Sequence, residues 1–249
     1  MNDNQTKDFR LELYSKYIST FKKFTGDEDS LNIKSEYELF RERYLSLIKE
    51  FPKNTAIIDL GCGTGYMLQF LKREGFQNLN GIDISEQQVN KARNKGLNAD
   101  VSNIFDFFNV NKKKFDIVFA LDVVEHFYKH ELLEFFTGIN CLLNENGIII
   151  IHTPNGEGLF PQHIIYGDLT HLTIFNPNSL GQILRLTGFN KIEYYETGPT
   201  SKNFNGLIRL MLWKIIKLVV KSVRIIETGG SEKIITQDFI CIAHKDKEL

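Results

Sequence analysis

Three glycines at alternate positions follow a short apolar run, and this arrangement constrains the fold more than any other part of the chain. The segment reads Ile57-Ile58-Asp59-Leu60-Gly61-Cys62-Gly63-Thr64-Gly65. Glycines allow a tight turn and let the backbone approach a ligand closely, and the free N–H groups of a following helix attract a carboxylate. The spacing differs from the G-x-G-x-x-G dinucleotide loop, and no Gly-Lys-Ser/Thr ending follows it. The segment therefore predicts a strand-to-helix turn that binds a nucleotide-type cofactor with an amino-acid carboxylate.

Strand-like and helix-like patterns alternate along the chain from residue 55 onward. Before them, aromatic and aliphatic residues recur at helical spacing and predict two helices between residues 8 and 50. Such alternation predicts an α/β fold with a mostly parallel sheet, whose ligands bind beyond the carboxyl ends of the strands. Ser85 and Gln88 predict a capping box for one helix. The predicted strands are 55–60, 79–84, 97–101, 115–121, 147–153, 190–196 and 234–243, and the predicted helices are 65–74, 86–95, 130–142, 177–187 and 205–226.

Length and charge limit the classes of function. The 249 residues, 42% of them hydrophobic, are sufficient for one large domain with a substantial core. The net charge of −1 and the lack of a basic field argue against a nucleic-acid partner. Three cysteines without a C-x-x-C pair, and a polar N-terminus without an apolar signal segment, favour a cytoplasmic protein.

The last predicted helix, 205–226, forms an insertion before the final strand. Its basic residues recur at three- and four-residue steps and form one stripe, with apolar residues over the rest of the helix. These charges exclude a transmembrane span. We favour packing of the apolar face on the domain or on a second subunit in a homodimer, and docking on the inner face of a membrane is the alternative. The single domain 1–249 then divides into N-terminal helices (1–50), a cofactor-binding core (51–197), the helical insertion (198–233) and the last strand with its tail (234–249).

The glycine loop belongs to a longer series of motifs. An acid, Asp83, ends the second predicted strand, another, Asp100, lies in the third, and Phe115-Asp116-Ile117-Val118 forms the fourth. This series resembles class I S-adenosylmethionine-dependent methyltransferases. The resemblance implies a methyltransferase enzyme with S-adenosylmethionine as its cofactor. It also implies a Rossmann-like fold with a seven-stranded, mostly parallel sheet and helices on both faces.

The resemblance further implies a set of cofactor-binding residues. Asp83 takes the position of the carboxylate that binds both ribose hydroxyls, roughly 20 residues after the glycine loop. Asp100 with Val101 matches the adenine-binding position, Asp59 orients the loop, and Leu121 lies beside the methionine portion. The full expected set is Asp59, Gly61, Cys62, Gly63, Gly65, Asp83, Ile84, Asp100, Val101 and Leu121.

The expected chemical site combines acids and histidines. Methyl transfer leaves a neutral thioether, so the enzyme aligns the acceptor with the methyl group and manages the acceptor's proton. Asp122, Glu125 and His126 follow the fourth strand at i, i+3 and i+4 spacing, which places them on one face of a helical turn. His171, in the long connection before residue 177, is expected to overhang the same end of the sheet. Asp122, His126 and His171 are the catalytic candidates.

The same four residues also permit a metal site. Some methyltransferases carry an acid-x-x-Glu-His motif and a later His that bind Mg²⁺ or a similar ion, and Asp122, Glu125, His126 and His171 resemble that set. A Mg²⁺ or Mn²⁺ ion there would lower the pKa of an acceptor hydroxyl. The alternative is a site without metal, in which His171 or His126 is the base.

The second half of the chain bears on the acceptor. Thr153-Pro154-Asn155, Tyr166-Gly167-Asp168 and Gly188-Phe189 resemble methyltransferases of bacterial capsule and O-antigen pathways. This implies O-methylation of a sugar hydroxyl, or of a phosphate- or phosphoramidate-type decoration, on a surface-glycan precursor. A quinone-precursor O-methyltransferase, for which the basic helix would dock on the membrane surface, is one alternative. A non-catalytic cofactor-binding module that contacts a partner enzyme is the other.

Overall fold

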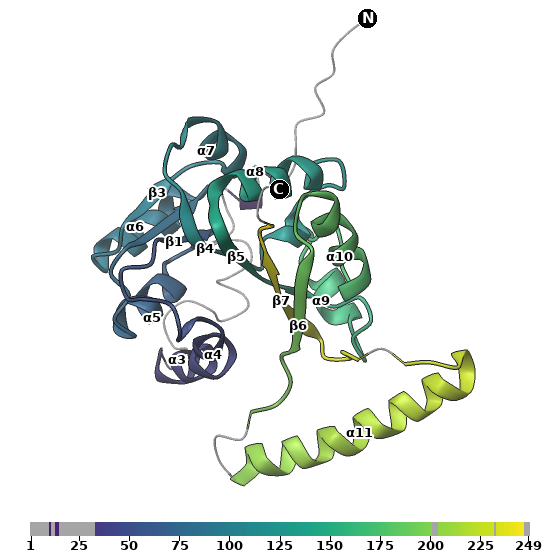
Figure 1. Ribbon diagram of the computed structural model, residues 1–249. Helices are drawn as coiled ribbons and strands as arrows, with labels where there is room; N and C mark the ends of the chain where they lie inside the picture. Colours follow the sequence, from purple (N-terminus) through teal and green to yellow (C-terminus); the bar gives the residue numbers. More distant parts are fainter. Residues whose placement is uncertain (1–9, 11–12, 15–32, 201–203, 232, 247–249) are drawn as a thin grey trace, which may run out of the picture.

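A seven-stranded sheet forms the centre of the molecule (Figure 1). The computed structural model describes residues 10, 13–14, 33–200, 204–231 and 233–246. The strand order is β3-β2-β1-β4-β5-β7-β6, and every neighbouring pair is parallel except the two pairs that involve β7. The strands are β1 (Ile57–Leu60), β2 (Leu79–Asp83), β3 (Ala99–Val101), β4 (Phe115–Leu121), β5 (Leu143–Pro154), β6 (Lys191–Glu196) and β7 (Asp238–His244). The predicted mostly parallel α/β sheet is confirmed.

Helices cover both faces of this sheet. One face carries α7, α8 and α10, and the other carries α3, the turn η2, α4 and α5. The helical elements are α3 (Ile33–Phe40), the π-helical turn η2 (Arg41–Leu45), α4 (Ser46–Ile48), α5 (Tyr66–Arg73), α6 (Glu86–Asn94), α7 (Ile104–Val110), the 3₁₀ turn η3 (Val124–His126), α8 (Leu132–Leu142), α9 (Gln162–Gly167), α10 (Pro177–Leu186) and α11 (Phe204–Thr228). The first predicted N-terminal helix lies mostly outside the described residues.

The central strands β1, β4 and β5 are mostly apolar because both of their faces are covered. In β4, Val118 packs into the cluster under α8 and α10, while Ile117 and Phe119 pack into the cluster under α3 and α5. Successive side chains of a strand point to opposite faces, so a strand between two helical layers needs a nearly continuous apolar run. This packing fixes the sheet and sets the carboxyl ends of β1, β2 and β4 at one edge.

Most predicted elements are confirmed, and a few details are wrong. The short helices α7 and α9 were not predicted, because neither is long enough to show an apolar period. The predicted capping box at Ser85 is wrong, because the Ser85 side chain makes no capping hydrogen bond. A capping box does occur at the start of α10, where the Asn176 side chain accepts from the Ser179 N–H and Ser179 accepts in return.

The apolar face of α11 does not pack on the domain, so this half of the expectation is wrong, while packing on a second subunit stays a prediction. None of its residues is buried, and it lies below the body of the molecule in Figure 1. Within the described part of the chain, no helix has both the length and the apolar character that a membrane crossing requires.

Candidate active site

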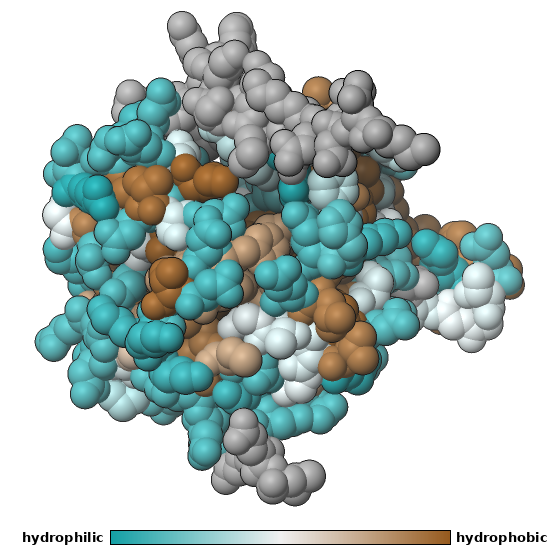
Figure 2. All heavy atoms as spheres, turned by 90° about the horizontal axis from the view of Figure 1, so that it is seen from above, coloured by the Kyte–Doolittle hydropathy of each residue, from teal (hydrophilic) through white to brown (hydrophobic). Residues whose placement is uncertain are grey.

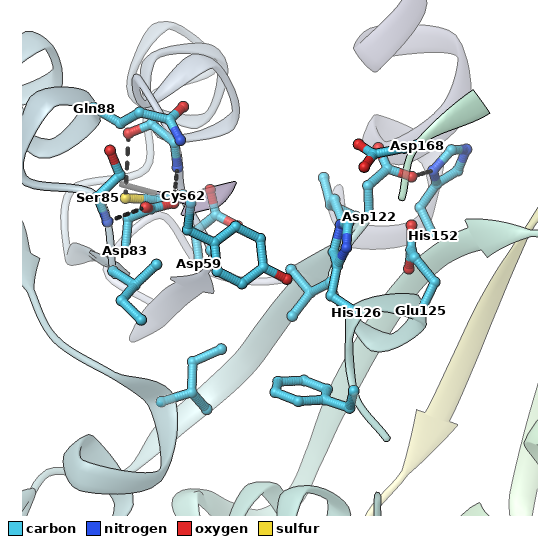
Figure 3. A pocket seen from close by; sticks show the side chains of 18 of the residues that line it. Asp59, Cys62, Asp83, Ser85, Gln88, Asp122, Glu125, His126, His152 and Asp168 are labelled. Atoms are coloured by element: carbon cyan, nitrogen blue, oxygen red, sulfur yellow. Dashed lines mark hydrogen bonds and ion pairs between the residues drawn. The ribbon is translucent and has the colours of Figure 1, made fainter. Parts of the chain in front are cut away.

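A cavity of about 820 Å³ lies at the carboxyl edge of the sheet. Figure 3 shows two groups of labelled side chains that line it. Asp59, Cys62, Asp83, Ser85 and Gln88 form the first group, around the glycine loop. The second group comes from the ends of β4 and β5 and from the connections that follow them, and it comprises Asp122, Glu125, His126, His152 and Asp168.

The glycine loop adopts backbone conformations that other residues rarely reach. Gly61, Gly63 and Gly65 have φ values of 74°, 53° and 80°, in the left-handed region that glycine favours. Space is also limited, because a Cβ at Gly61 would lie 2.6 Å from Val123 Cγ2 and one at Gly65 would lie 2.4 Å from Leu97 Cδ1. The loop therefore depends on glycine for both conformation and packing. Gly61, Cys62 and Gly63 line the cavity, and Gly65 lies behind them at the start of α5.

Asp83 is held against the glycine loop from the end of β2. Its Oδ2 accepts the Gly63 N–H at 2.9 Å and its Oδ1 accepts the Ser85 N–H at 2.8 Å. These bonds fix the buried carboxylate at the cavity wall, next to Ile84. This is the position expected of a ribose-binding acid.

Asp59, at the base of the loop, is a second buried acid. Burial, and then the negative charge of Asp83, raise the pKa of Asp59 to about 8. At neutral pH the Asp59 side chain therefore keeps its proton, and the loop avoids two adjacent negative charges.

The residues after β3, rather than those within it, reach the cavity. Asp100, whose side chain is 72% exposed, pairs with Arg93 Nη2 at 2.8 Å, and neither Asp100 nor Val101 lines the cavity. This placement corrects the expectation for both residues. The Asn103 side chain accepts the Phe105 N–H at 2.9 Å and so caps α7, and the cavity is lined here by Ser102, Asn103, Ile104 and Phe105. Asn103, a residue that favours N-caps, is the signal that could have predicted α7.

Asp122, directly after β4, is paired with a histidine from the neighbouring strand. His152 Nδ1 lies 2.7 Å from Asp122 Oδ1, and the Asp122 backbone has a φ of 53°, a strained conformation of the kind found at functional sites. The Asp122 side chain is 61% exposed, in the cavity. Desolvation by the surrounding protein raises its pKa, but the charge and hydrogen bond of His152 outweigh this and lower the pKa below the ordinary value. Burial lowers the pKa of His152, and Asp122 more than reverses that effect.

Glu125, His126 and His171 form a separate cluster. One ligand atom from each lies within 4.8 Å of the other two, and the two imidazole ring centroids are 5.0 Å apart. The backbone explains how these segments meet, because the Glu125 carbonyl accepts the N–H groups of Leu172 at 2.8 Å and Thr173 at 3.0 Å. Asp122 is directed to His152 and does not belong to this group. The predicted four-residue metal set thus contains three residues that meet.

The free atoms of this cluster fit a divalent cation. His126 Nδ1 lies 3.0 Å from the Thr170 carbonyl and His171 Nδ1 lies 2.9 Å from the Ile164 carbonyl. A carbonyl only accepts, so each Nδ1 donates a proton, and in the neutral form of each ring Nε2 has the lone pair that a metal needs. Metal-binding histidines are oriented in this way. Glu125 Oε2 accepts from Thr153 at 3.1 Å, while Glu125 Oε1 is buried with no hydrogen-bond partner among the described residues. Burial, and then the charge of Asp122, raise the pKa of Glu125 well above its ordinary value, and a cation would favour its ionised form.

Two residues from the N-terminal part of the chain, which were not predicted as site residues, also line the cavity. Arg10 Nη1 donates to the His126 carbonyl at 3.0 Å and, with its second nitrogen, holds Glu131. The Tyr14 ring meets the His126 ring edge-on at 5.9 Å. No local pattern indicates such contacts, because they join segments far apart in the sequence.

Comparisons with known proteins agree with this geometry. A family model described as a methyltransferase domain matches residues 33–194. The ubiquinone biosynthesis O-methyltransferase of Pelagibacter ubique is 30% identical over 129 residues, which are 46% of this chain and 52% of that protein. The mitochondrial ubiquinone biosynthesis O-methyltransferase of Dictyostelium discoideum is 30% identical over 114 residues, 40% of this chain and 35% of that protein. The chain thus spans about a third to a half of the length of these relatives.

Solved structures share the whole fold. A SAM-dependent methyltransferase from Archaeoglobus fulgidus superimposes with a TM-score of 0.67 at 21% identity, over 90% of this chain and 100% of that one. Magnesium protoporphyrin IX methyltransferase from Synechocystis PCC 6803, a structure with bound SAM, gives a TM-score of 0.59 at 15% identity, over 98% of this chain and 100% of that one. With the family model across most of the sheet, these matches confirm the Rossmann-like methyltransferase fold. The chain belongs to the methyltransferase domain family, and its sheet has the fold of class I S-adenosylmethionine-dependent methyltransferases.

Proposed function

We propose that this methyltransferase transfers its methyl group to a hydroxyl oxygen that binds between Asp122 and the cluster of Glu125, His126 and His171. The observation that carries the proposal is this cluster, which offers two imidazole nitrogens and one buried carboxylate oxygen that has no hydrogen-bond partner in the described part of the chain, beside the cavity. Such nitrogen and oxygen atoms can accept a hydrogen bond from a substrate hydroxyl, or they can ligate a cation that binds this hydroxyl.

The cofactor would be held by the first group of residues. The Asp83 carboxylate would accept hydrogen bonds from the ribose hydroxyls, and the glycine loop with the start of α5 would receive the amino-acid carboxylate. Ser102–Phe105 line the cavity beside these residues and would contact the base. This arrangement would point the sulfonium methyl group toward Leu121 and Asp122, at the end of β4.

The chemical step is an in-line displacement. The acceptor oxygen bonds to the methyl carbon, the carbon–sulfur bond breaks, and its electron pair leaves with sulfur as neutral S-adenosylhomocysteine. The hydroxyl proton goes to the Asp122 carboxylate, which His152 keeps ionised. A divalent ion held by Glu125, His126 and His171 would supply Lewis-acid activation of the hydroxyl. The protein contributes alignment, which is worth up to about 7–11 kcal/mol in well-oriented systems.

For the acceptor, we propose an aromatic ring that carries adjacent hydroxyl groups, as in a quinone precursor. The relatives named for ubiquinone biosynthesis support this choice, and so do the apolar side chains of Phe40, Phe127 and Ile164 in the cavity. The surface-glycan precursor stays a second prediction, which rests on the sequence motifs alone.

A methyl-transfer assay tests both acceptors. Purified protein and methyl-labelled S-adenosylmethionine would be incubated with 1,2-dihydroxybenzene compounds or with nucleotide sugars, and the product would be located by NMR. We expect the label on oxygen, at the aromatic hydroxyl. His171→Ala should lose turnover yet bind S-adenosylmethionine normally, whereas the surface variant His130→Ala should keep both. A label on nitrogen or carbon would contradict O-methylation, and transfer to a sugar hydroxyl alone would select the glycan acceptor.

A further inference from the structure

Helix α11 exposes an apolar surface that no other described part of the chain covers. Twelve of its large apolar side chains are each at least 40% exposed: Phe204, Leu207, Ile208, Met211, Leu212, Ile215, Ile216, Leu218, Val219, Val223, Ile225 and Ile226. Over the body of the molecule in Figure 2, by contrast, apolar side chains lie in small groups among hydrophilic ones. A contiguous apolar surface of this kind marks an interaction site.

These twelve side chains share one half of the helix. At 100° per residue they occupy a sector of about 180°, which contains only two polar residues, Asn205 and Ser222, both uncharged. All six charged residues of α11 lie on the other half, and five of them are basic: Arg209, Lys214, Lys217, Lys221 and Arg224. Two of these cations, Arg209 and Lys214, stand next to the two borders of the apolar half.

The charged half faces the domain. Lys217 Nζ lies 2.6 Å from Glu196 Oε2, at the end of β6. A Cβ on Gly198 would lie 3.2 Å from Trp213 Nε1. This side of the helix therefore approaches the segment that follows β6. The apolar half therefore points away from the fold.

The position of α11 relates this surface to the active site. The helix connects the end of β6 to the start of β7, at the edge of the sheet where β5 also ends. Asp238, the first residue of β7, pairs with Pro154 of β5, and both residues line the cavity. The apolar surface and the cavity thus belong to the same edge of the sheet.

We propose that the apolar half of α11 docks on an anionic lipid bilayer. A helix lying in a bilayer surface buries a whole apolar side, whereas a seam between two helices covers a narrower stripe and would leave much of this sector in water. The basic residues at its borders suit anionic headgroups, since long basic side chains reach from an apolar layer to the charged surface. Docking would turn the cavity edge toward the membrane, and so toward an aromatic acceptor that lies in the bilayer, a consequence that rests on the proposed function.

Vesicle flotation with the full chain tests the docking without any acceptor, so its failure is distinct from a failure of methyl transfer. Vesicles of phosphatidylcholine with phosphatidylglycerol should bind the protein, and vesicles of phosphatidylcholine alone should bind it more weakly. Leu218→Glu should weaken the binding about tenfold or more, because it removes apolar area from the interface. The matched control is Leu186→Glu on α10, since the leucines are 68% and 71% exposed, and it should bind as the wild type does.

Lys214→Glu supplies a second, milder test, because it keeps the apolar half intact. It should reduce binding to the anionic vesicles and flatten the dependence of binding on salt. Circular dichroism and S-adenosylmethionine binding would verify that each variant folds. Absence of flotation, or equal losses in Leu218→Glu and Leu186→Glu, would overturn the proposal. A dimer that Leu218→Glu dissociates, with no vesicle binding by the wild type, would also overturn it and assign the surface to a second copy of the chain.

Discussion

His152 reaches across from β5 to hold Asp122 at the end of β4, with Nδ1 and Oδ1 2.7 Å apart. The histidine is buried, and the aspartate is open to the cavity in a left-handed backbone conformation. The pair therefore presents one fixed carboxylate at the point where the methyl group is expected.

We predict that His152→Ala slows methyl transfer and spares cofactor binding. Without the imidazole, the Asp122 carboxylate loses the partner that orients it and keeps it ionised, and kcat should fall roughly 10- to 100-fold, as for other outer partners of catalytic groups. Steady-state kinetics and S-adenosylmethionine titration would measure the two effects. The control is His130→Ala, on the surface. An unchanged kcat in His152→Ala would remove Asp122 from the proposed proton transfer.

Asp83→Ala is expected to weaken S-adenosylmethionine binding by about 100-fold or more, since it removes two hydrogen bonds to a charged group, which contribute about 1.5–3 kcal/mol each. Calorimetric titration would give the Kd. Asp100→Ala is the matched control, because Asp100 pairs with Arg93 outside the cavity, and its Kd should match that of the wild type. Equal losses in the two variants would contradict the assignment of the ribose to Asp83.

The cluster of Glu125, His126 and His171 is predicted to bind Mn²⁺ or Mg²⁺. His171→Ala should weaken binding at least tenfold, because it removes one of three ligands, and His130→Ala should not. Calorimetry with the metal salt alone measures this without turnover. Failure of the wild type to bind either ion, with full activity after exhaustive chelation, would favour a site in which histidine serves as the base.

The stability of the cofactor-free protein should fall as the pH rises through the neutral range. The pKa of Asp59 is raised from 3.8 to about 8 in the fold, so between these values the folded state binds a proton that the unfolded chain has released. Asp59→Asn removes this titration, and its Tm should decline less between pH 6 and 8.5 than that of the wild type. Differential scanning calorimetry would test this. The exposed variant Asp106→Asn should follow the wild type, and a parallel decline in Asp59→Asn would refute the expectation.

Local sequence patterns were sufficient to predict the fold. The glycine loop could be recognised because its conformation demands glycine at positions 61, 63 and 65. The apolar runs of β4 and β5 could be recognised because helices cover both faces of these strands. The glycine loop and the apolar runs each span about ten residues or fewer, and over such short segments the residue pattern predicts the local structure.

Only the tertiary structure decided which polar groups meet. The sequence spacing predicted that Asp122, Glu125 and His126 lie together on one turn. The register of β4 against β5 instead brings the Asp122 carboxylate to the His152 side chain. His171 joined the other two because the backbone after it bonds to the Glu125 carbonyl.

Tertiary contacts also explain the two positions that were predicted wrongly from the sequence. Asp100 has a suitable type and position in the sequence, yet its side chain turns to Arg93. The periodicity of α11 correctly predicted a helix but not where its apolar half lies, which depends on how the chain leaves β6 and enters β7. Sequence periodicity determines the face of an element, whereas the neighbour of that face depends on strand register and on the paths of connections between distant segments.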